Sequence, residues 1–192
     1  MAKITGFKTL DIRFPTSTEK HGSDAMNPDP DYSAAYLILE TDDPKFSGHS
    51  LVFTIGRGND LQCNSIAQLA ETVVGEDLFT LEKRIGQIGK DLVRDSQIRW
   101  LGPEKGIPHM AAGGVVNALW DLICKINGKP LWKQLAGMSP EALVDLIDFR
   151  HISDAITSTE ALSILQKAQN ARTANEKVLL EKGLPAYTTT PG

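Results

Sequence analysis

The sequence predicts an α+β fold in which a small antiparallel sheet is followed by helices. Three apolar segments separated by turn residues occupy the first sixty of the 192 residues, and helical periodicity dominates most of the chain after them. Hydrophobic residues make up 41% and charged residues 23%, a composition typical of a globular protein. A complete (β/α)8 barrel takes roughly 250 residues, so this chain is too short to hold one.

The predicted strands span residues 4–14, 33–41 and 50–55. The second strand closes at the strong breaker formed by residues 42–44, and the third ends at a turn with two glycines, residues 56–59. The connection between the second and third strands is thus short, whereas a long polar loop separates the first two strands. We expect an antiparallel meander that buries one face under helices.

Helical periodicity predicts three helices in the middle of the chain, around residues 66–73, 78–92 and 109–126. The last of these has the widest apolar face, which places it in the core. Its C-terminus is predicted at Asn127 and Gly128, because glycine readily adopts the left-handed conformation that ends helices.

The character of the sequence changes after about residue 146. Residues 146–152 are compatible with a short strand. Thr157 and Glu160 form a capping box that predicts a helix running towards residue 180. Residues 187–190 again have the composition of a strand.

Charge and cysteine content narrow the class of partner and the compartment. The formal charge is −4, which argues against nucleic acid or an anionic membrane as the main partner. No apolar run approaches the ~18 residues of a membrane span, and the first residues lack the apolar segment of a secretion signal. Cys63 and Cys124 both lie in helical patterns, so we expect free thiols and a cytoplasmic protein.

Local spacing does not predict a metal site. The sequence has no paired Cys-x-x-Cys and no HExxH, and its four histidines are widely scattered, which favours surface or loop positions for each: His21, His49, His109 and His151.

Two loops carry candidate binding residues. Residues 22–26 lie in the long polar loop between the first two strands, and such a loop is either a binding loop or a mobile connector. Residues 56–58 follow a strand and precede a helix, which favours a plain turn with Asp60 as the helix N-cap over a phosphate-binding loop. Arg57 in that turn is suited to holding a carboxylate.

Residues 95–105 form a third loop, rich in charged residues around Trp100. A recognition patch is one reading. The commoner outcome, a solvated loop anchored by a buried Trp100, is the one we expect.

Taken together, nine segments resemble the L-fuconate dehydratase family of the enolase superfamily, which includes fungal L-galactonate dehydratases. They follow one another in the family's order and cover essentially the whole chain: residues 11–17, 22–26, 29–36, 53–59, 95–106, 116–122, 128–133, 147–150 and 185–189. The resemblance implies an N-terminal α+β capping domain that covers the mouth of a modified (β/α) barrel. It also implies a carbon–oxygen lyase of carbohydrate acid catabolism.

In such an enzyme the proton α to a carboxylate is removed and Mg²⁺ stabilises the ene-diolate. The β-hydroxyl then leaves, so that L-fuconate becomes 2-keto-3-deoxy-L-fuconate. The resemblance assigns substrate contact, or a place beside the site, to six residues: Gly22, Ser23, Asp24, Tyr32, Arg57 and Tyr187. The first three match a substrate-contacting loop, and Tyr187 falls on what resembles the first barrel strand.

The catalytic and metal-binding residues of the family have no counterpart in this sequence. The family's base is the second lysine of a Lys-x-Lys, which is absent here, and its Mg²⁺ ligands and catalytic histidine would follow residue 192. We therefore expect residues 1–146 to be the capping domain and residues 147–192 to be a linker helix and the start of a barrel. We expect no metal ligand and no catalytic residue within this chain.

Two further expectations follow from the resemblance. The chain is a fragment of a sugar-acid dehydratase that is inactive alone, with Mg²⁺ used only by the full-length family. It also exposes apolar surface that a barrel would cover, so self-association is expected. The alternatives are a non-catalytic α+β module that binds a partner chain or an aldonic acid, and a generic α+β domain whose similarity is only ancestral.

Overall fold

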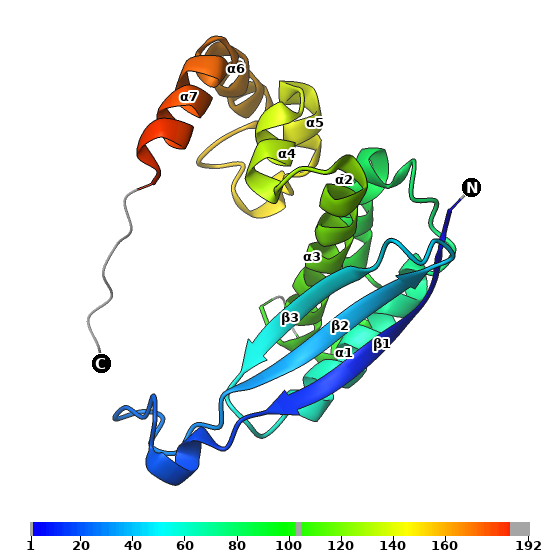
Figure 1. Cartoon of the computed structure of the whole chain (residues 1–192), viewed down its shortest axis with the longest axis vertical. Helices are drawn as coiled ribbons and strands as arrows, with labels where there is room; N and C mark the ends of the chain where they lie inside the picture. Colours follow the sequence, from blue (N-terminus) through cyan, green and yellow to red (C-terminus); the bar gives the residue numbers. More distant parts are fainter. Residues whose placement is uncertain (1, 103–104, 185–192) are drawn as a thin grey trace. The chain divides into compact units, whose positions relative to one another are not determined.

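The computed structural model describes residues 2–102 and 105–184, which form two compact units (Figure 1). The first unit ends at Leu131 and the second begins at Trp132. The expected division between capping domain and barrel, after residue 146, concerns the family's domains and stays a prediction. No helix within the described ranges is long and apolar enough to cross a membrane.

The first unit contains the expected three-stranded antiparallel sheet, in the order β1-β2-β3. The strands are β1 (Ile4–Arg13), β2 (Ser33–Thr41) and β3 (Gly48–Thr54). Alternation along β2 places Ala35, Leu37 and Leu39 on the buried face. This agrees with the strands predicted from the sequence, except that β3 begins two residues earlier and that β1 and β3 each end one residue earlier.

Helices α1 (Asn59–Ala70) and α3 (Ile107–Asn127) lie on the buried face of this sheet, and α2 (Leu81–Val93) packs beside α3 (Figure 1). The third helix is the central one, as its apolar face predicted: Val115, Leu119 and Leu122 are fully buried. It ends at Gly128, which has φ 60° and is the expected C-cap.

A close approach of backbone joins β3 to α3. A Cβ on Gly48 would lie 2.4 Å from the carbonyl oxygen of Ala118, and one on Gly114 would lie 2.9 Å from Cγ2 of Val52. Glycine at both positions therefore lets the sheet and the helix pack at a distance that a larger residue would prevent.

The loop around Trp100 differs from expectation. Residues Ile98–Leu101 form a single 3-10 turn, which begins where the Asp95 carboxylate accepts hydrogen bonds from the backbone of Gln97 and Ile98. Trp100 is 84% exposed, so the prediction of a buried anchor is wrong. The local turn is closed by Asp95, and no packing of the indole is needed to hold it.

The second unit is helical, with α4 (Leu131–Gly137), α5 (Pro140–Asp145), α6 (Ser158–Ala168) and α7 (Arg172–Lys182). The predicted capping box is present: Thr157 and Glu160 exchange hydrogen bonds between side chain and backbone at 2.8 and 3.2 Å. The helix predicted to run towards residue 180 is interrupted by a 3-10 turn at Gln169–Ala171.

The short strand expected at residues 146–152 is wrong. The segment contains a 3-10 turn at Phe149–His151, because the Asp148 carboxylate accepts a hydrogen bond from the Arg150 backbone N–H at 3.1 Å and caps the turn. The strand-like residues 187–190 lie outside the described residues.

Candidate functional site

The two candidate loops meet at one end of the sheet. The first connects the end of β1 to the start of β2, and the second connects the end of β3 to α1. The strand register pairs Arg13 with Ser33 and Ser33 with Thr54, so both loops leave the sheet at the same end of the strands. Antiparallel pairing therefore brings residues 14–32 beside residues 55–58.

Asp31 joins the two loops. Its backbone N–H donates to the carbonyl oxygen of Ile55 at 3.1 Å, which ties the first loop to the end of β3. Its carboxylate Oδ1 accepts from the backbone N–H of Ser17 at 3.1 Å and from the Ser17 hydroxyl at 2.6 Å. These bonds, with smaller contributions from the charges of Arg13 and Arg57, lower the pKa of Asp31. Sequence analysis did not single out this residue, since its partners are distant in sequence.

Two predicted site residues, Gly22 and Tyr32, lie against each other. Gly22 has φ 71°, and a Cβ there would lie 2.0 Å from the Tyr32 hydroxyl oxygen. The backbone N–H of Tyr32 donates to the Thr16 hydroxyl at 2.9 Å, and its ring meets Phe53 edge-on with centroids 5.4 Å apart. Tyr32 therefore packs between the first loop and β3.

The Asp24 carboxylate closes a turn within its own loop. Its Oδ1 accepts from the backbone N–H of Met26 at 2.8 Å and of Asn27 at 2.7 Å, and these bonds lower the pKa of Asp24. Ser23 is half-buried next to it, and its backbone N–H donates to Lys20. The loop is thus built by its own side chains, and Asp24 stays ionised and exposed at neutral pH.

Arg57 is exposed at the tip of the second loop, between Gly56 and Gly58, which have φ 122° and 92°. Within the described residues its guanidinium makes no hydrogen bond or ion pair, and its interaction is the charge attraction of nearby Asp31. The predicted strand-to-helix turn is confirmed, although Gly58 occupies the N-cap position and Asp60 lies in the first turn of α1. The N-cap prediction for Asp60 is therefore wrong.

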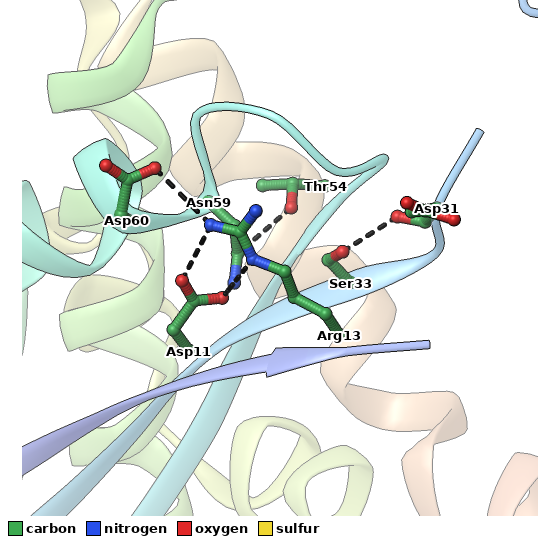
Figure 2. Close-up of polar contacts among 7 residues, drawn as sticks. All are labelled: Asp11, Arg13, Asp31, Ser33, Thr54, Asn59 and Asp60. Carbon is green, nitrogen blue, oxygen red and sulfur yellow. Dashed lines mark hydrogen bonds and ion pairs between the residues drawn. The ribbon is translucent and has the colours of Figure 1, made fainter. Parts of the chain in front are cut away.

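A polar network supports this turn from below (Figure 2). Arg13 holds Asp11 through two hydrogen bonds of 2.8 and 2.7 Å and lies 3.5 Å from Asp60. The fully buried Asn59 donates to Asp11 and accepts from the Thr54 hydroxyl at 2.6 Å. The bonds from Arg13 and Asn59 lower the pKa of Asp11 to about 2. The network joins the end of β1, the end of β3 and the start of α1.

Tyr187, the sixth predicted site residue, lies outside the described residues. Across residues 2–102 and 105–184, no three His, Cys, Asp or Glu side chains are grouped so that they could hold a metal ion. That part of the chain does not fit a Mg²⁺ site.

A hollow of about 590 Å³ lies along α3, at a different place in the first unit. It is lined by residues that include Trp120, Cys124 and Lys129. Burial raises the pKa of the Cys124 thiol, which keeps it neutral and weakly nucleophilic. The hollow offers no arrangement of groups that points to a reaction.

Comparison with known proteins identifies close relatives. The chain is 51% identical over 190 residues to L-galactonate dehydratase from Hypocrea jecorina, covering 98% of this chain and 42% of that protein. It is 45% identical to human mitochondrial enolase superfamily member 1, again over 42% of the relative. The crystal structure of that human protein superposes with a TM-score of 0.91 over 98% of this chain. No family model matches the sequence.

A more distant solved structure shares the fold of most of the chain. L-talarate dehydratase from Polaromonas sp. JS666, in complex with Mg and L-glucarate, matches 70% of this chain with a TM-score of 0.52 and 21% identity. Together with the match to the human protein, this shows that the chain has the fold of the N-terminal domain of enolase-superfamily proteins. The chain spans about 42% of the length of the curated relatives that it matches.

Proposed function

We propose that this chain, which is part of an enolase-superfamily protein, is the substrate-capping part of a sugar-acid dehydratase. The family follows from its homologues, which are L-galactonate dehydratase and mitochondrial enolase superfamily member 1. The longer protein would remove water from an acid of the L-galactonate or L-fuconate class and form a 2-keto-3-deoxy acid. In this proposal the two loops at the end of the sheet bind and orient the sugar acid.

One observation carries the proposal: the loops that hold the predicted contacts converge at Asp31 and leave the Arg57 guanidinium without an ion-pair partner among the described residues. A guanidinium binds oxygen atoms of a carboxylate or a polyol through several N–H groups. The hydroxyls of Ser23 and Tyr32 and the carboxylate of Asp24 add donors and acceptors of the kind that select sugar hydroxyls.

The chemistry of the reaction is assigned to other groups. Mg²⁺, when bound, would stabilise the ene-diolate formed by proton abstraction. The described residues form no metal site, and the sequence lacks the Lys-x-Lys that supplies the family's base. We therefore propose that residues outside these 192 hold the metal and move the proton, and that this chain alone is inactive.

A turnover assay tests the inactivity. The purified chain is incubated with L-galactonate or L-fuconate and Mg²⁺, and formation of a 2-keto-3-deoxy acid is followed. We expect no product above the reaction without protein. An activity that forms this product, co-purifies with the chain and is abolished by a chelator would overturn this part of the proposal.

A binding experiment tests the capping role. On the ¹⁵N-labelled chain, L-galactonate should shift the amide resonances of residues 22–24 and Arg57, because its hydroxyl groups are expected to contact these two loops. Arg57→Gln should weaken the response, and Arg99→Gln, at another exposed arginine, should leave it intact. Absence of any shift in these loops at millimolar acid would contradict the capping role.

We also propose a reducing compartment, the cytoplasm, because Cys63 and Cys124 are free thiols.

Self-association of the isolated chain is proposed as well. The outer face of the sheet carries exposed apolar side chains, among them Leu10, Leu51 and Phe53. Rows of exposed apolar residues on a sheet favour association.

A further inference from the structure

Resting on the proposed function, we propose that Asp31 is a specificity-determining residue whose carboxylate selects sugar acids with one carboxylate over those with two. The distinction is between an aldonate, with an uncharged group at the far end of the carbon chain, and an aldarate, with a second carboxylate there. Position, charge and chemistry of the two loops support it.

Asp31 is held in place at the point where the loops meet. Ser17 donates two hydrogen bonds to Oδ1, and the Asp31 backbone N–H donates to the carbonyl oxygen of Ile55. Figure 2 shows a further contact, in which the Ser33 hydroxyl donates to the Asp31 carbonyl oxygen at 2.7 Å. The second carboxylate oxygen, Oδ2, has no hydrogen-bond partner among the described residues. It is therefore available to accept from a sugar hydroxyl, and it repels another carboxylate.

The surrounding charge has the same sign. Residues 14–32 and 55–58 carry four carboxylates, from Glu19, Asp24, Asp29 and Asp31, against the two cations of Lys20 and Arg57. Arg13 adds no free cation, because Asp11 and Asp60 already engage its guanidinium. The loop pair is thus net negative, although Arg57 remains able to bind oxygen atoms.

The reaction fixes which end of the substrate meets these loops. Dehydration begins at the carbon next to a carboxylate, and the proposed function assigns that step to groups outside this chain. The capping loops then face the opposite end of the molecule. An aldonate presents neutral hydroxyl groups there, which Asp31 Oδ2 can accept from, whereas an aldarate presents a like charge.

The experiment compares L-galactonate with galactarate, which differs from it by oxidation of the terminal carbon. Dissociation constants are measured from the amide shifts of residues 22–24 and 56–58 in three proteins: the wild type, Asp31→Asn and Asp29→Asn. The asparagine at position 31 keeps an oxygen that can accept from Ser17, so the loop geometry is retained and only the charge is lost. Asp29 is an exposed carboxylate of the same loop and provides the matched control.

We expect the wild type to bind L-galactonate at least fivefold more tightly than galactarate, the effect of about one like-charge contact near a protein surface. Asp31→Asn should bring the two constants within about twofold of each other, while Asp29→Asn should keep the wild-type preference. Raising the ionic strength from 0.02 to 0.5 M should reduce the wild-type preference, since screening weakens a charge effect and leaves a purely steric one unchanged.

Equal affinities of the wild type for the two acids would overturn this inference and leave the capping role standing. The same would follow if Asp29→Asn changed the preference as much as Asp31→Asn does. Failure of the wild type to bind either acid would overturn the proposed function together with the inference.

Discussion

The Tyr32 hydroxyl lies so close to Gly22 that a Cβ at position 22 would be 2.0 Å from its oxygen atom. Tyr32 is anchored by the Thr16 hydroxyl and packs edge-on against Phe53 of β3. The ring therefore fixes where the backbone of the first loop passes. Its proposed contact with substrate and its packing role share one side chain.

Gly22→Ala should destabilise the first unit by about 2 kcal/mol. Roughly half of this comes from the left-handed φ of 71°, and the rest from displacement of Tyr32. Urea unfolding measures the loss. Gly58→Ala is the control, since Gly58 has φ 92° but no atom within 4 Å of its Cβ position, so it should cost about 1 kcal/mol. In a Tyr32→Ala background the cost at position 22 should fall to that of the control.

Asn59→Ala should lower the unfolding free energy by about 2–3 kcal/mol. The variant leaves the Thr54 hydroxyl and part of the Asp11 carboxylate without their hydrogen bonds, at a position that is fully buried. Chemical denaturation measures it. Asn64→Ala, at an exposed position of the same helix, should change stability by less than about 0.5 kcal/mol. Equal effects of the two variants would mean that the network contributes little.

The network also predicts a pH dependence. The pKa of Asp11 is about 2 in the folded chain, below its ordinary 3.8, so the folded state favours the ionised carboxylate. Its contribution to stability is therefore complete above about pH 4 and is lost as the pH falls from 3.8 towards 2. Urea midpoints measured between pH 5 and 2 should decline, and Asp11→Asn should flatten part of the decline. A curve that is unchanged in the variant would assign the acid sensitivity to other carboxylates.

Self-association of the isolated chain should depend on the outer face of the sheet. Leu10 and Leu51 flank Tyr36 in one row of that face and are 43% and 53% exposed. The double variant Leu10→Lys, Leu51→Lys should shift the sedimentation profile towards monomer, because it places like charges on both apposed surfaces. Leu61→Lys, an equally exposed leucine of α1, should not. A wild type that is monomeric at high concentration would contradict the proposal.

The sheet and the cap of α6 could be predicted from sequence because their causes are local. Breakers bound the strands, and Thr157 and Glu160 are three residues apart. Asp31 and Asn59 could not be found this way, since their partners Ser17, Ile55 and Asp11 come close only after the strands have paired. Glycines between β3 and α1 indicated the turn, but nothing in the local sequence indicated what supports it.

The expectation for Trp100 was wrong for a related reason. A large aromatic in a polar loop is usually buried, yet the turn here is closed by the Asp95 carboxylate, and the indole is left exposed. Similarly, the segment at residues 146–152 has the residue types of a strand, but the described residues of its own unit contain no strand to pair with, and Asp148 caps a 3-10 turn instead.

The connectivity of the sheet bears on how the chain is made. All three strands come from the first 54 residues and pair with their neighbours in sequence, and the helices that cover them are complete by Asn127. Such neighbouring pairings form quickly because little loop-closure entropy opposes them. The first unit can therefore fold on the ribosome while later residues are still in the exit tunnel. The sheet and the two loops at its end are then in place before the rest of the polypeptide emerges.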